Sequence, residues 1–330
     1  MPFSTKTNDI IVDKVNIYRD MKIGVIIPAY RVKEFIKNLL LSIPRSIDLI
    51  IVVDDKCPEA SGQEAEKVLD NRITVIYHEQ NMGVGGAVVS GYKKALEVGC
   101  DIVIKIDGDG QMDPKYIPDL IAPLITDEAD FSKGNRFTDF KALKKMPKIR
   151  LFGNSVLSFL LKMTSGYWNI IDPTNGYTAI HRRVLEKLDL NRISKRYFFE
   201  SDMLIHLNMI NAVVTDISIP ARYGNEKSSL SVSKIALQFP PRLLRGFIKR
   251  IFLKYFIYDF NMASVYLILG LPMFFFGIIY GMIEWLDSLI SGTPKTAGTI
   301  MLIALPIIVS FQMLLQAINI DIYSTPKRSR

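Results

Sequence analysis

Short apolar runs and longer amphipathic stretches alternate along the N-terminal part of the chain. The apolar runs contain few polar residues, which is typical of strands buried on both faces, whereas the stretches between them have helical spacing. Strands that alternate with helices in this way favour a mostly parallel sheet. The sequence therefore predicts an α/β fold, with strands at 22–28, 48–53, 73–78, 102–106 and 129–133 and helices at 32–42, 63–69 and from about 87 to 98.

The pattern changes after Ser231. Residues 240–256 are basic and aromatic, and they predict an amphipathic helix that lies in a membrane interface. Two uncharged, predominantly apolar runs follow at 262–283 and 297–320, each about as long as a transmembrane helix requires. Prolines are tolerated in such helices. Two buried core helices are the alternative, and the length of the runs argues against it.

Composition and charge support a membrane-bound protein. The chain has 330 residues, a net charge of +8 and a mean hydropathy of +0.19, which is high for a purely soluble protein. Basic clusters lie just before the apolar runs and at the chain end, so they indicate an anionic membrane surface more than nucleic acid. Cys57 and Cys100 are isolated, which argues against a zinc site or a disulfide framework. Residues 1–20 lack the apolar core of a signal peptide.

Positive residues flank the two apolar runs on one side of the predicted membrane. The connector between the runs, residues 284–296, has a single basic residue, Lys295. Because basic loops favour the cytoplasm, both termini and the N-terminal domain are expected to be cytoplasmic. The basic residues that set this asymmetry are Lys249, Arg250, Lys254, Lys327, Arg328 and Arg330.

Two carboxylates follow the strand predicted at 102–106. Asp107 and Asp109 are separated by Gly108, and Gln111 comes two residues later. In an open α/β sheet this position is the carboxyl edge, where ligands bind, and the glycine lets the backbone approach a ligand closely. Hard oxygen ligands suit Mg²⁺ or Mn²⁺ shared with substrate phosphates. An Asp/Gly-rich surface turn is the alternative. Asp113, which precedes a proline, is expected to be a helix N-cap.

A second glycine-rich segment, Asn81 to Ala87, approximates the GxGxxG pattern of dinucleotide-binding proteins. Its spacing differs from that pattern, and it follows the third predicted strand rather than the first. A loop that positions a nucleotide or a helix N-terminus is therefore favoured over a site for a hydride-transfer cofactor.

The order of these motifs resembles that of the family-2 inverting glycosyltransferases of GT-A fold. Later segments are similar to the polyprenyl-phosphate sugar synthases, a branch that includes the dolichyl-phosphate and undecaprenyl-phosphate hexose synthases. The resemblance covers about residues 22–235 and depends on the whole series rather than on one motif. The segments that carry it are Pro28–Tyr30, Asp54–Asp55, Asn81–Gly85, Asp107–Gln111, Lys133–Phe137, Asp172–Tyr177, Phe199–Asp202 and Tyr223–Ser228.

This resemblance implies a Rossmann-like GT-A catalytic domain with a mostly parallel sheet, followed by a C-terminal two-helix transmembrane segment. The expected parts are a polar N-terminal extension, the GT-A domain, a basic amphipathic interfacial helix, two transmembrane helices and a basic tail. Their expected boundaries are 1–20, 21–235, 236–260, 261–324 and 325–330.

The resemblance also implies roles on the donor side. Pro28, Tyr30, Val53 and Asp55 would line a nucleoside pocket, with Asp55 accepting hydrogen bonds from the base; a turn or N-cap aspartate is the alternative for Asp55. Val32 stands where the family commonly has an acidic residue. The metal and, through it, the donor diphosphate would be held by Asp107, Asp109 and Gln111, with Gly108 between them.

Basic residues are expected to meet phosphate groups. Arg136 matches an arginine of the synthases that faces the phosphates, and Arg150 is a second candidate. A guanidinium fork suits phosphate oxygens better than an ammonium group does. Lys227 matches a lysine that meets the acceptor phosphate or the donor diphosphate. The family arginine upstream falls on Ala221, with Arg222 adjacent. A solvated role is the alternative for each of these basic residues.

Asp202 matches the acidic position that acts as general base in relatives whose acceptor is a sugar hydroxyl. Since a polyprenyl phosphate is already ionised, Asp202 is expected to orient the acceptor site, with Glu200 a weaker candidate. A helix N-terminal pair favoured by the macrodipole is the alternative. His78, His181 and His206 share no ligand spacing and are expected to be structural.

The sequence thus predicts a metal-dependent transferase that moves a hexose from a nucleoside diphosphate sugar to polyprenyl phosphate, with UDP-glucose favoured and GDP-mannose as the other donor. One rival is a transferase of the same fold that acts on the hydroxyl of a lipid-linked glycan or polysaccharide. Another is a non-catalytic membrane scaffold. The expected partners are the nucleotide sugar, the lipid and the membrane, without nucleic acid, and a homo-oligomer is left open.

Overall fold

The computed structural model describes residues 21–137, 148–220 and 232–328, which form two units. The first unit extends to Phe247 and includes the segment from Pro326, and the second is Ile248–Thr325. The predicted N-terminal extension, Arg222, Lys227 and the side chain of Arg150 lie outside the described residues.

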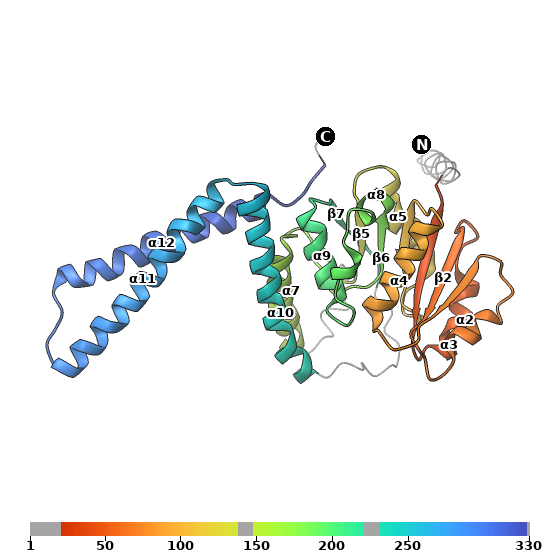
Figure 1. Ribbon diagram of the computed structural model, residues 1–330, viewed down its shortest axis with the longest axis horizontal. Helices are drawn as coiled ribbons and strands as arrows, with labels where there is room; N and C mark the ends of the chain where they lie inside the picture. Colours follow the sequence, from red (N-terminus) through yellow and green to blue (C-terminus); the bar gives the residue numbers. More distant parts are fainter. Residues whose placement is uncertain (1–20, 138–147, 221–231, 329–330) are drawn as a thin grey trace, which may run out of the picture. The chain divides into compact units, whose positions relative to one another are not determined.

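The first unit is built on a seven-stranded sheet in the order β3-β2-β1-β4-β6-β5-β7 (Figure 1). Strand β6 is antiparallel to its neighbours β4 and β5, and the other pairs are parallel. The predicted α/β fold with a mostly parallel sheet is therefore confirmed. The strands are β1 (Ile23–Ala29), β2 (Leu49–Asp54), β3 (Ile73–Tyr77), β4 (Ile102–Lys105), β5 (Phe131–Asn135), β6 (Thr178–His181) and β7 (Val214–Ser218).

Helices cover both faces of this sheet because the strands β1, β2 and β4 carry buried apolar side chains on both faces. One core contains side chains of α2 (Lys33–Ser42), α3 (Ser61–Glu66) and α5 (Ile117–Ile125). The other contains side chains of α4 (Val84–Glu97) and α9 (Phe199–Met209). Figure 1 shows these helices beside the strands. The remaining helices of this part are η2 (Pro114–Tyr116), α7 (Lys148–Ser165), α8 (Arg182–Leu185) and η3 (Leu190–Arg192).

Helix boundaries differ from the prediction by a few residues where side chains cap the chain. The helix expected at 63–69 is α3, and it begins at Ser61 because the Asp54 carboxylate accepts the N–H groups of Cys57 and Gly62. The predicted N-cap at Asp113 is confirmed, since its side chain accepts the N–H of Lys115.

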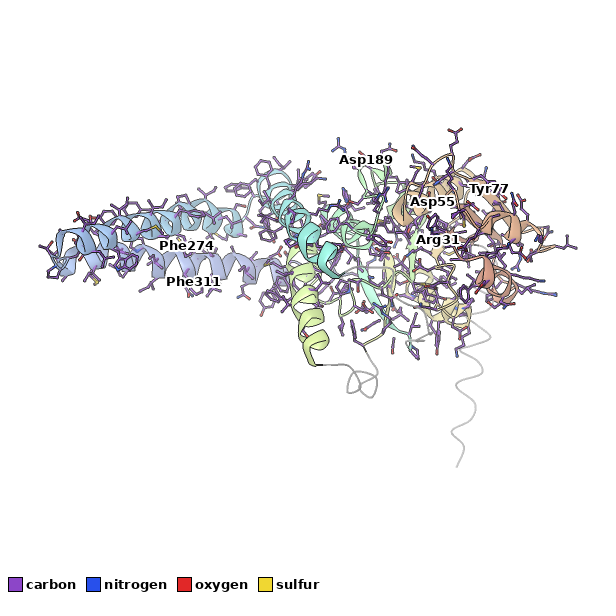
Figure 2. All side chains as sticks on the ribbon, turned by 90° about the horizontal axis from the view of Figure 1, so that it is seen from below. Arg31, Asp55, Tyr77, Asp189, Phe274 and Phe311 are labelled. Carbon is purple, nitrogen blue, oxygen red and sulfur yellow. The ribbon has the colours of Figure 1, made fainter. Side chains whose placement is uncertain are left out.

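The second unit contains two long apolar helices, α11 (Met262–Ser291) and α12 (Ala297–Tyr323). Both are long and apolar enough to cross a membrane, and only 22% and 6% of their most apolar windows are buried. Figure 2 shows side chains projecting along both helices, among them Phe274 and Phe311. The alternative of two buried core helices is therefore not supported.

Close packing joins α11 to α12. A Cβ atom on Gly277 would lie 2.6 Å from the Ile307 side chain, and one on Gly281 would lie 2.8 Å from Ile303. Small residues let helix backbones approach closely where no hydrophobic driving force operates, as in a bilayer. The glycines of α11 thus give the hairpin its helix contact.

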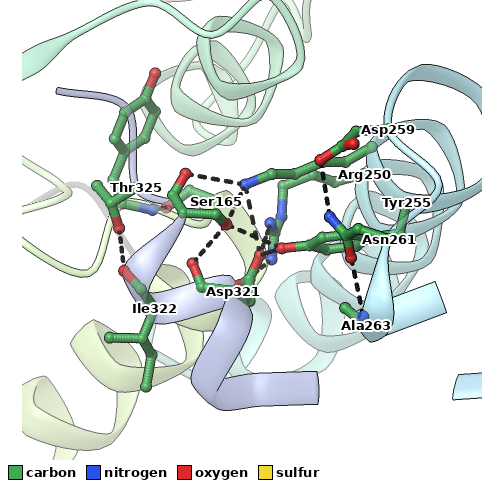
Figure 3. Close-up of polar contacts among 12 residues, drawn as sticks. Ser165, Arg250, Tyr255, Asp259, Asn261, Ala263, Asp321, Ile322 and Thr325 are labelled. Carbon is green, nitrogen blue, oxygen red and sulfur yellow. Dashed lines mark hydrogen bonds and ion pairs between the residues drawn. The ribbon is translucent and has the colours of Figure 1, made fainter. Parts of the chain in front are cut away.

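The expected interfacial helix is α10 (Val232–Phe252), continued by the π-helical segment η4 (Leu253–Tyr258). Arg250 is fully buried, and its Nη1 and Nη2 lie 2.7 and 2.9 Å from Asp321 Oδ1 and Oδ2 (Figure 3). The Tyr255 hydroxyl donates to Asp321 Oδ1, and Lys254 Nζ donates to Ser324 Oγ. Arg250 and Lys254 were expected to be membrane-surface charges, but this cluster instead ties α10 and η4 to the end of α12.

The basic tail also makes internal contacts. Arg328 Nη2 lies 3.0 Å from Asp127 Oδ1 and 2.9 Å from Asp130 Oδ1, and Arg183 pairs with the same two carboxylates. Arg328 is thus held by ion pairs to Asp127 and Asp130.

We predict that Asp321→Asn destabilises the protein because it leaves Arg250 buried without a carboxylate. Breaking a buried ion pair typically costs about 3–5 kcal/mol. The melting temperature of the detergent-purified full chain should fall clearly below that of the wild type. Asp287→Asn is the control, because Asp287 pairs with Lys295 at a largely exposed position and should change the melting temperature little. Equal shifts in the two variants would contradict the prediction.

Candidate active site

The direction of the strands brings the predicted site residues to one edge of the sheet. The parallel strands β1, β2, β4, β5 and β7 end at this edge, and the antiparallel strand β6 begins there. Thr178, the first residue of β6, pairs with Lys105 of β4 and with Lys133 of β5. The segment Asp172–Tyr177, which precedes β6, therefore lies between the loops that follow β4 and β5.

The loop after β4 carries the two aspartates. Asp107 Oδ1 lies 2.8 Å from Lys105 Nζ, and Asp109 Oδ1 accepts the N–H of Gln111. A Cβ atom on Gly108 would lie 3.0 Å from the Val32 side chain and 3.1 Å from the Pro28 carbonyl oxygen. The loops after β1 and β4 are thus in contact at Gly108, where a side chain would push them apart.

A second loop contacts Asp107 from the side of β6. A Cβ atom on Gly176 would overlap Lys105 Nζ and would lie 2.8 Å from Asp107 Oδ2. From the sequence, the segment 172–177 was expected only to be part of a motif series. Its glycine is needed because the backbone passes directly against this ion pair.

Arg136 follows β5 and forms a bidentate pair with Asp172. Its Nε lies 2.7 Å from Oδ2, and its Nη2 lies 3.1 Å from Oδ1. Asp172 is completely buried, whereas the Arg136 side chain is 42% exposed. Burial by itself would raise the pKa of Asp172, but the hydrogen bonds and charge of Arg136 outweigh it and lower the pKa. The guanidinium is therefore fixed in orientation at the sheet edge.

Two buried lysines beneath the loops were missed from the sequence. Lys105 is 1% exposed and pairs with Asp107 and, at 3.2 Å, with Glu200. Burial opposes its charge, but the two carboxylates outweigh this effect and raise its pKa. Burial lowers the pKa of Lys133 to about 8, and its ammonium group donates to the Asn175 carbonyl oxygen. A lysine in an otherwise apolar strand was the available signal for Lys105, whereas Lys133 stands among Ser132, Gly134 and Asn135 and gave no such signal.

The acidic residues at the start of α9 separate into two roles. Glu200 faces Lys105 and so reaches the aspartate loop, although it was the weaker candidate. Asp202 Oδ2 accepts the N–H of Ser194, and its other oxygen lies 3.5 Å from His206 Nδ1. Residues two apart on a helix point about 200° away from each other, which explains the difference. Asp202 holds the segment before α9.

Asp55 is buried and bound by the glycine-rich segment. Its carboxylate accepts the N–H groups of Met82 and Gly83, and it also lies 2.7 Å from His78 Nδ1. The N–H groups that would cradle a pyrophosphate in a dinucleotide site are thus taken by Asp55. The structure therefore matches the turn alternative for Asp55, and its contact with a base stays a prediction.

The glycines of this segment also support α9. Gly83 has a φ of +84°, and a Cβ atom on Gly85 would overlap the Ser194 carbonyl oxygen. The Gly86 N–H donates to the Lys195 carbonyl oxygen at 2.9 Å. The predicted loop that positions a helix N-terminus is observed here, at the segment leading into α9.

Three further residues were expected to line a nucleoside pocket. Tyr30 is exposed just beyond β1, and Pro28 is half-buried at the same edge. Val53 is completely buried in the core with Ile26 and Ile51, so its side chain is unavailable to a nucleoside. The loop at Tyr30 is fixed because Cys57 Sγ accepts the N–H of Arg31 at 3.0 Å. Figure 2 labels Arg31 and Asp55 in this region.

The oxygen donors at this edge fit a divalent cation that arrives with its substrate. Within the described ranges, no group of three or more His, Cys, Asp or Glu residues is placed to hold a metal alone. Mg²⁺ is usually bound by one or two carboxylates together with substrate phosphates and waters rather than by an all-protein cage. Asp107 and Asp109 have the chemistry for such a shared site.

We predict that Asp216→Asn stabilises the protein above about pH 6. Asp216 of β7 accepts the N–H of Ile171, and burial, with a smaller contribution from the charge of Asp172, raises its pKa to about 6. Because the native carboxyl binds its proton more tightly than the unfolded one, wild-type stability is lost as pH rises from about 4 through 6. The neutral variant avoids this loss, which amounts to about 1–3 kcal/mol.

The measurement is the melting temperature of both proteins between pH 4 and 8. The difference should grow with pH and become constant above about pH 7. Glu97→Gln, at an exposed position of α4, should give no such trend. A difference that does not vary with pH would show that Asp216 is ionised throughout.

Comparison with known proteins adds a family match. The family model described as "Glycosyl transferase family 2" matches residues 24–189. A UDP-N-acetylglucosamine–dolichyl-phosphate N-acetylglucosaminyltransferase of Methanococcus voltae is 34% identical over 201 residues, which cover 56% of this chain and 80% of the relative. A polyprenol monophosphomannose synthase of Mycolicibacterium smegmatis is 30% identical over 225 residues, covering 64% and 80%.

Among solved structures, the chain is similar to glucosyl-3-phosphoglycerate synthase from Mycobacterium tuberculosis in complex with UDP. The TM-score is 0.55 with 18% sequence identity, over 76% of this chain and 85% of that chain. At this identity the match establishes the fold alone. It agrees with the predicted GT-A architecture.

Proposed function

Because the chain belongs to glycosyl transferase family 2, we propose that it moves a hexose or N-acetylhexosamine from a nucleoside diphosphate sugar to a polyprenyl phosphate, with inversion at the anomeric carbon. The chain is a glycosyltransferase by its family. The relatives named above act on dolichyl or polyprenol phosphate, and two helices that could span a membrane would keep the protein beside such a lipid. The donor, the acceptor and the residue roles are the proposal.

The observation that carries this proposal is the meeting of Asp107, Gly176 and Glu200 around Lys105 at the carboxyl edge of the sheet. Three segments of the motif series, far apart in sequence, contribute to one site. This is where ligands bind in open α/β sheets.

Asp109, Gln111 and Asp107 would hold Mg²⁺ or Mn²⁺ together with the donor diphosphate. The bound cation would neutralise the charge that grows on the departing nucleoside diphosphate. Arg136, whose orientation is set by the buried Asp172, lies at the same edge and would bind phosphate oxygens. Arg150 and Lys227 remain candidates from the sequence for further phosphate contacts.

A nucleoside would lie against Tyr30 and Pro28, with Asp55 near the base. The exposed ring of Tyr30 supports stacking, and the buried carboxylate of Asp55 supports a role through the loop it fixes. A UDP-sugar is the first donor to test, since the Methanococcus voltae relative is named for UDP-N-acetylglucosamine. UDP-glucose and GDP-mannose follow.

The acceptor needs no general base. A phosphate oxygen of the lipid attacks the anomeric carbon, the bond from that carbon to the donor diphosphate breaks, and the nucleoside diphosphate leaves with the electron pair. Enclosure of both substrates supplies orientation. Asp202 would be required as a base only for a hydroxyl acceptor, and its bond to the Ser194 N–H favours the positioning role instead.

In the membrane, α11 and α12 would span the bilayer with both chain termini on the cytoplasmic side. The connector between the two helices carries a single lysine, and that lysine is paired with Glu284 and Asp287. The basic residues, which favour the cytoplasm, lie instead before α11 and after α12. A nucleotide sugar and the lipid phosphate would then meet at the cytoplasmic face.

We predict metal-dependent transfer of radiolabelled sugar into organic-extractable lipid. The full chain in membranes would receive polyprenyl phosphate, Mn²⁺ or Mg²⁺, and a panel of UDP- and GDP-linked sugars. One donor should label a lipid that is cleaved by mild acid. Asp109→Ala should lower the rate by about 10²–10³-fold, because a group that stabilises developing charge is lost.

Lys115→Ala, at an exposed position close to the aspartate loop, serves as the control and should retain activity. Label that appears only in a lipid-linked oligosaccharide would overturn the phosphate acceptor and favour the hydroxyl acceptor, with Asp202 as base. Absence of transfer from every donor to either acceptor would overturn the proposed activity.

We also predict that Arg136→Lys weakens donor binding. A lysine cannot form the bidentate pair with Asp172, so its ammonium would not be held at the sheet edge. The KM for the donor should rise by about 10-fold or more, in the range found when a residue that orients a ligand is lost. Arg192→Lys, a largely exposed residue paired with Asp189, should leave the KM unchanged. An unaltered donor KM in Arg136→Lys would exclude the phosphate contact.

A further inference from the structure

Lys105 bridges two carboxylates that come from different elements of the fold. Its Nζ lies 2.8 Å from Asp107 Oδ1, just beyond β4, and 3.2 Å from Glu200 Oε1, in the first turn of α9. The lysine is 1% exposed, whereas the side chains of Asp107 and Glu200 are 30% and 19% exposed. The ammonium group therefore lies beneath both acids and holds them from below.

The surroundings restrict Asp107 further. Its N–H donates to Met112 Sδ at 3.3 Å, and Gly176 passes so close that a methyl group there would overlap Lys105 Nζ. The lysine thus binds Oδ1, and the backbone at Gly176 lies against Oδ2. Neighbours on three different segments therefore restrict Asp107.

We propose that Lys105 is a positioning residue, which sets Asp107 for the metal and couples the donor side of the site to α9 through Glu200. This inference rests on the proposed function, and it assigns roles to Lys105 and Glu200 that the family match does not supply. Lys105 acts by holding the carboxylates of Asp107 and Glu200 in place rather than by contacting the substrates.

Charge and geometry make opposite predictions for the loss of this lysine. A cation next to a metal-ligating carboxylate repels an incoming divalent ion, so removal of the charge alone would strengthen metal binding. Loss of positioning would weaken it, because Asp107 and Glu200 would repel each other and leave their present arrangement. Partners that orient metal ligands are typically worth about 10–100-fold in metal affinity.

The chain offers a matched control in Lys133. This lysine is equally buried, and it lies on β5, on the other side of β6 from β4, where it pairs with the same residue, Thr178. Its ammonium donates to a carbonyl oxygen, that of Asn175, rather than to Asp107. Lys133→Met therefore removes a buried ammonium without removing the bridge.

The experiment measures the affinity of the full chain for Mn²⁺ by electron paramagnetic resonance at saturating UDP. In Lys105→Met the dissociation constant should rise by about 10–100-fold. It should stay near the wild-type value in Lys133→Met, although both variants lose melting temperature. Equal or tighter Mn²⁺ binding in Lys105→Met would overturn the proposal.

Glu200→Gln tests the coupling, and it does so independently of whether Lys105→Met folds. If Lys105 links the two acids, Glu200→Gln should itself weaken Mn²⁺ binding, but in the Lys105→Met background it should restore part of the lost affinity, because it removes the repulsion between Glu200 and Asp107. Effects that simply add, or a Glu200→Gln variant with wild-type affinity, would overturn the coupling. Because no acceptor or sugar is present, a wild-type protein that binds Mn²⁺ and UDP but transfers no sugar to polyprenyl phosphate would refute only the proposed function.

Discussion

The reversed direction of β6 is the constraint on which the candidate site depends. The strands around it are parallel and end at one edge of the sheet, and β6 begins at that edge between β4 and β5. The segment 172–177 is thereby inserted between the aspartate loop and Arg136. Had β6 been parallel, this segment would lie at the opposite edge, and neither Gly176 nor Asp172 would reach its present partners.

Buried charges are balanced in small groups beneath this edge. Lys105 lies between Asp107 and Glu200, Arg136 is paired with Asp172, and Asp55 binds His78 and two backbone N–H groups. In each group, charged side chains are withdrawn from water, and the arrangement is stable only because hydrogen bonds and opposite charges compensate for the lost hydration. The same pairing fixes the orientation of the side chains at this edge, so that a substrate bound as proposed would meet a preorganised site.

The second unit also contains a buried ion pair, which joins helices rather than loops. Arg250 and Asp321 are buried together, and Tyr255 and Lys254 complete the cluster at the end of α12. A bidentate pair of this kind has a defined geometry, and it joins α10 to the end of α12. The two long helices thus have apolar surfaces that suit lipid, and the buried Arg250–Asp321 ion pair fixes the end of α12.

The sequence by itself determined the α/β fold, because wholly apolar strands and amphipathic helices can bury their surfaces in few other ways. It also identified two helices long enough to span a membrane, and it placed Asp107, Asp109, Gln111 and Arg136 at strand ends. Only the tertiary structure showed that Glu200 contacts Lys105 whereas Asp202 binds the Ser194 N–H. It also showed that Val53 lies in the core and that the Asp55 carboxylate binds the glycine-rich loop. These outcomes depend on which segments meet across the sheet, and local pattern carries no information about that. Lys105 is the clearest case, because Asp107 is its only partner nearby in sequence, and the fold is needed to bring Glu200 of α9 to the same ammonium group.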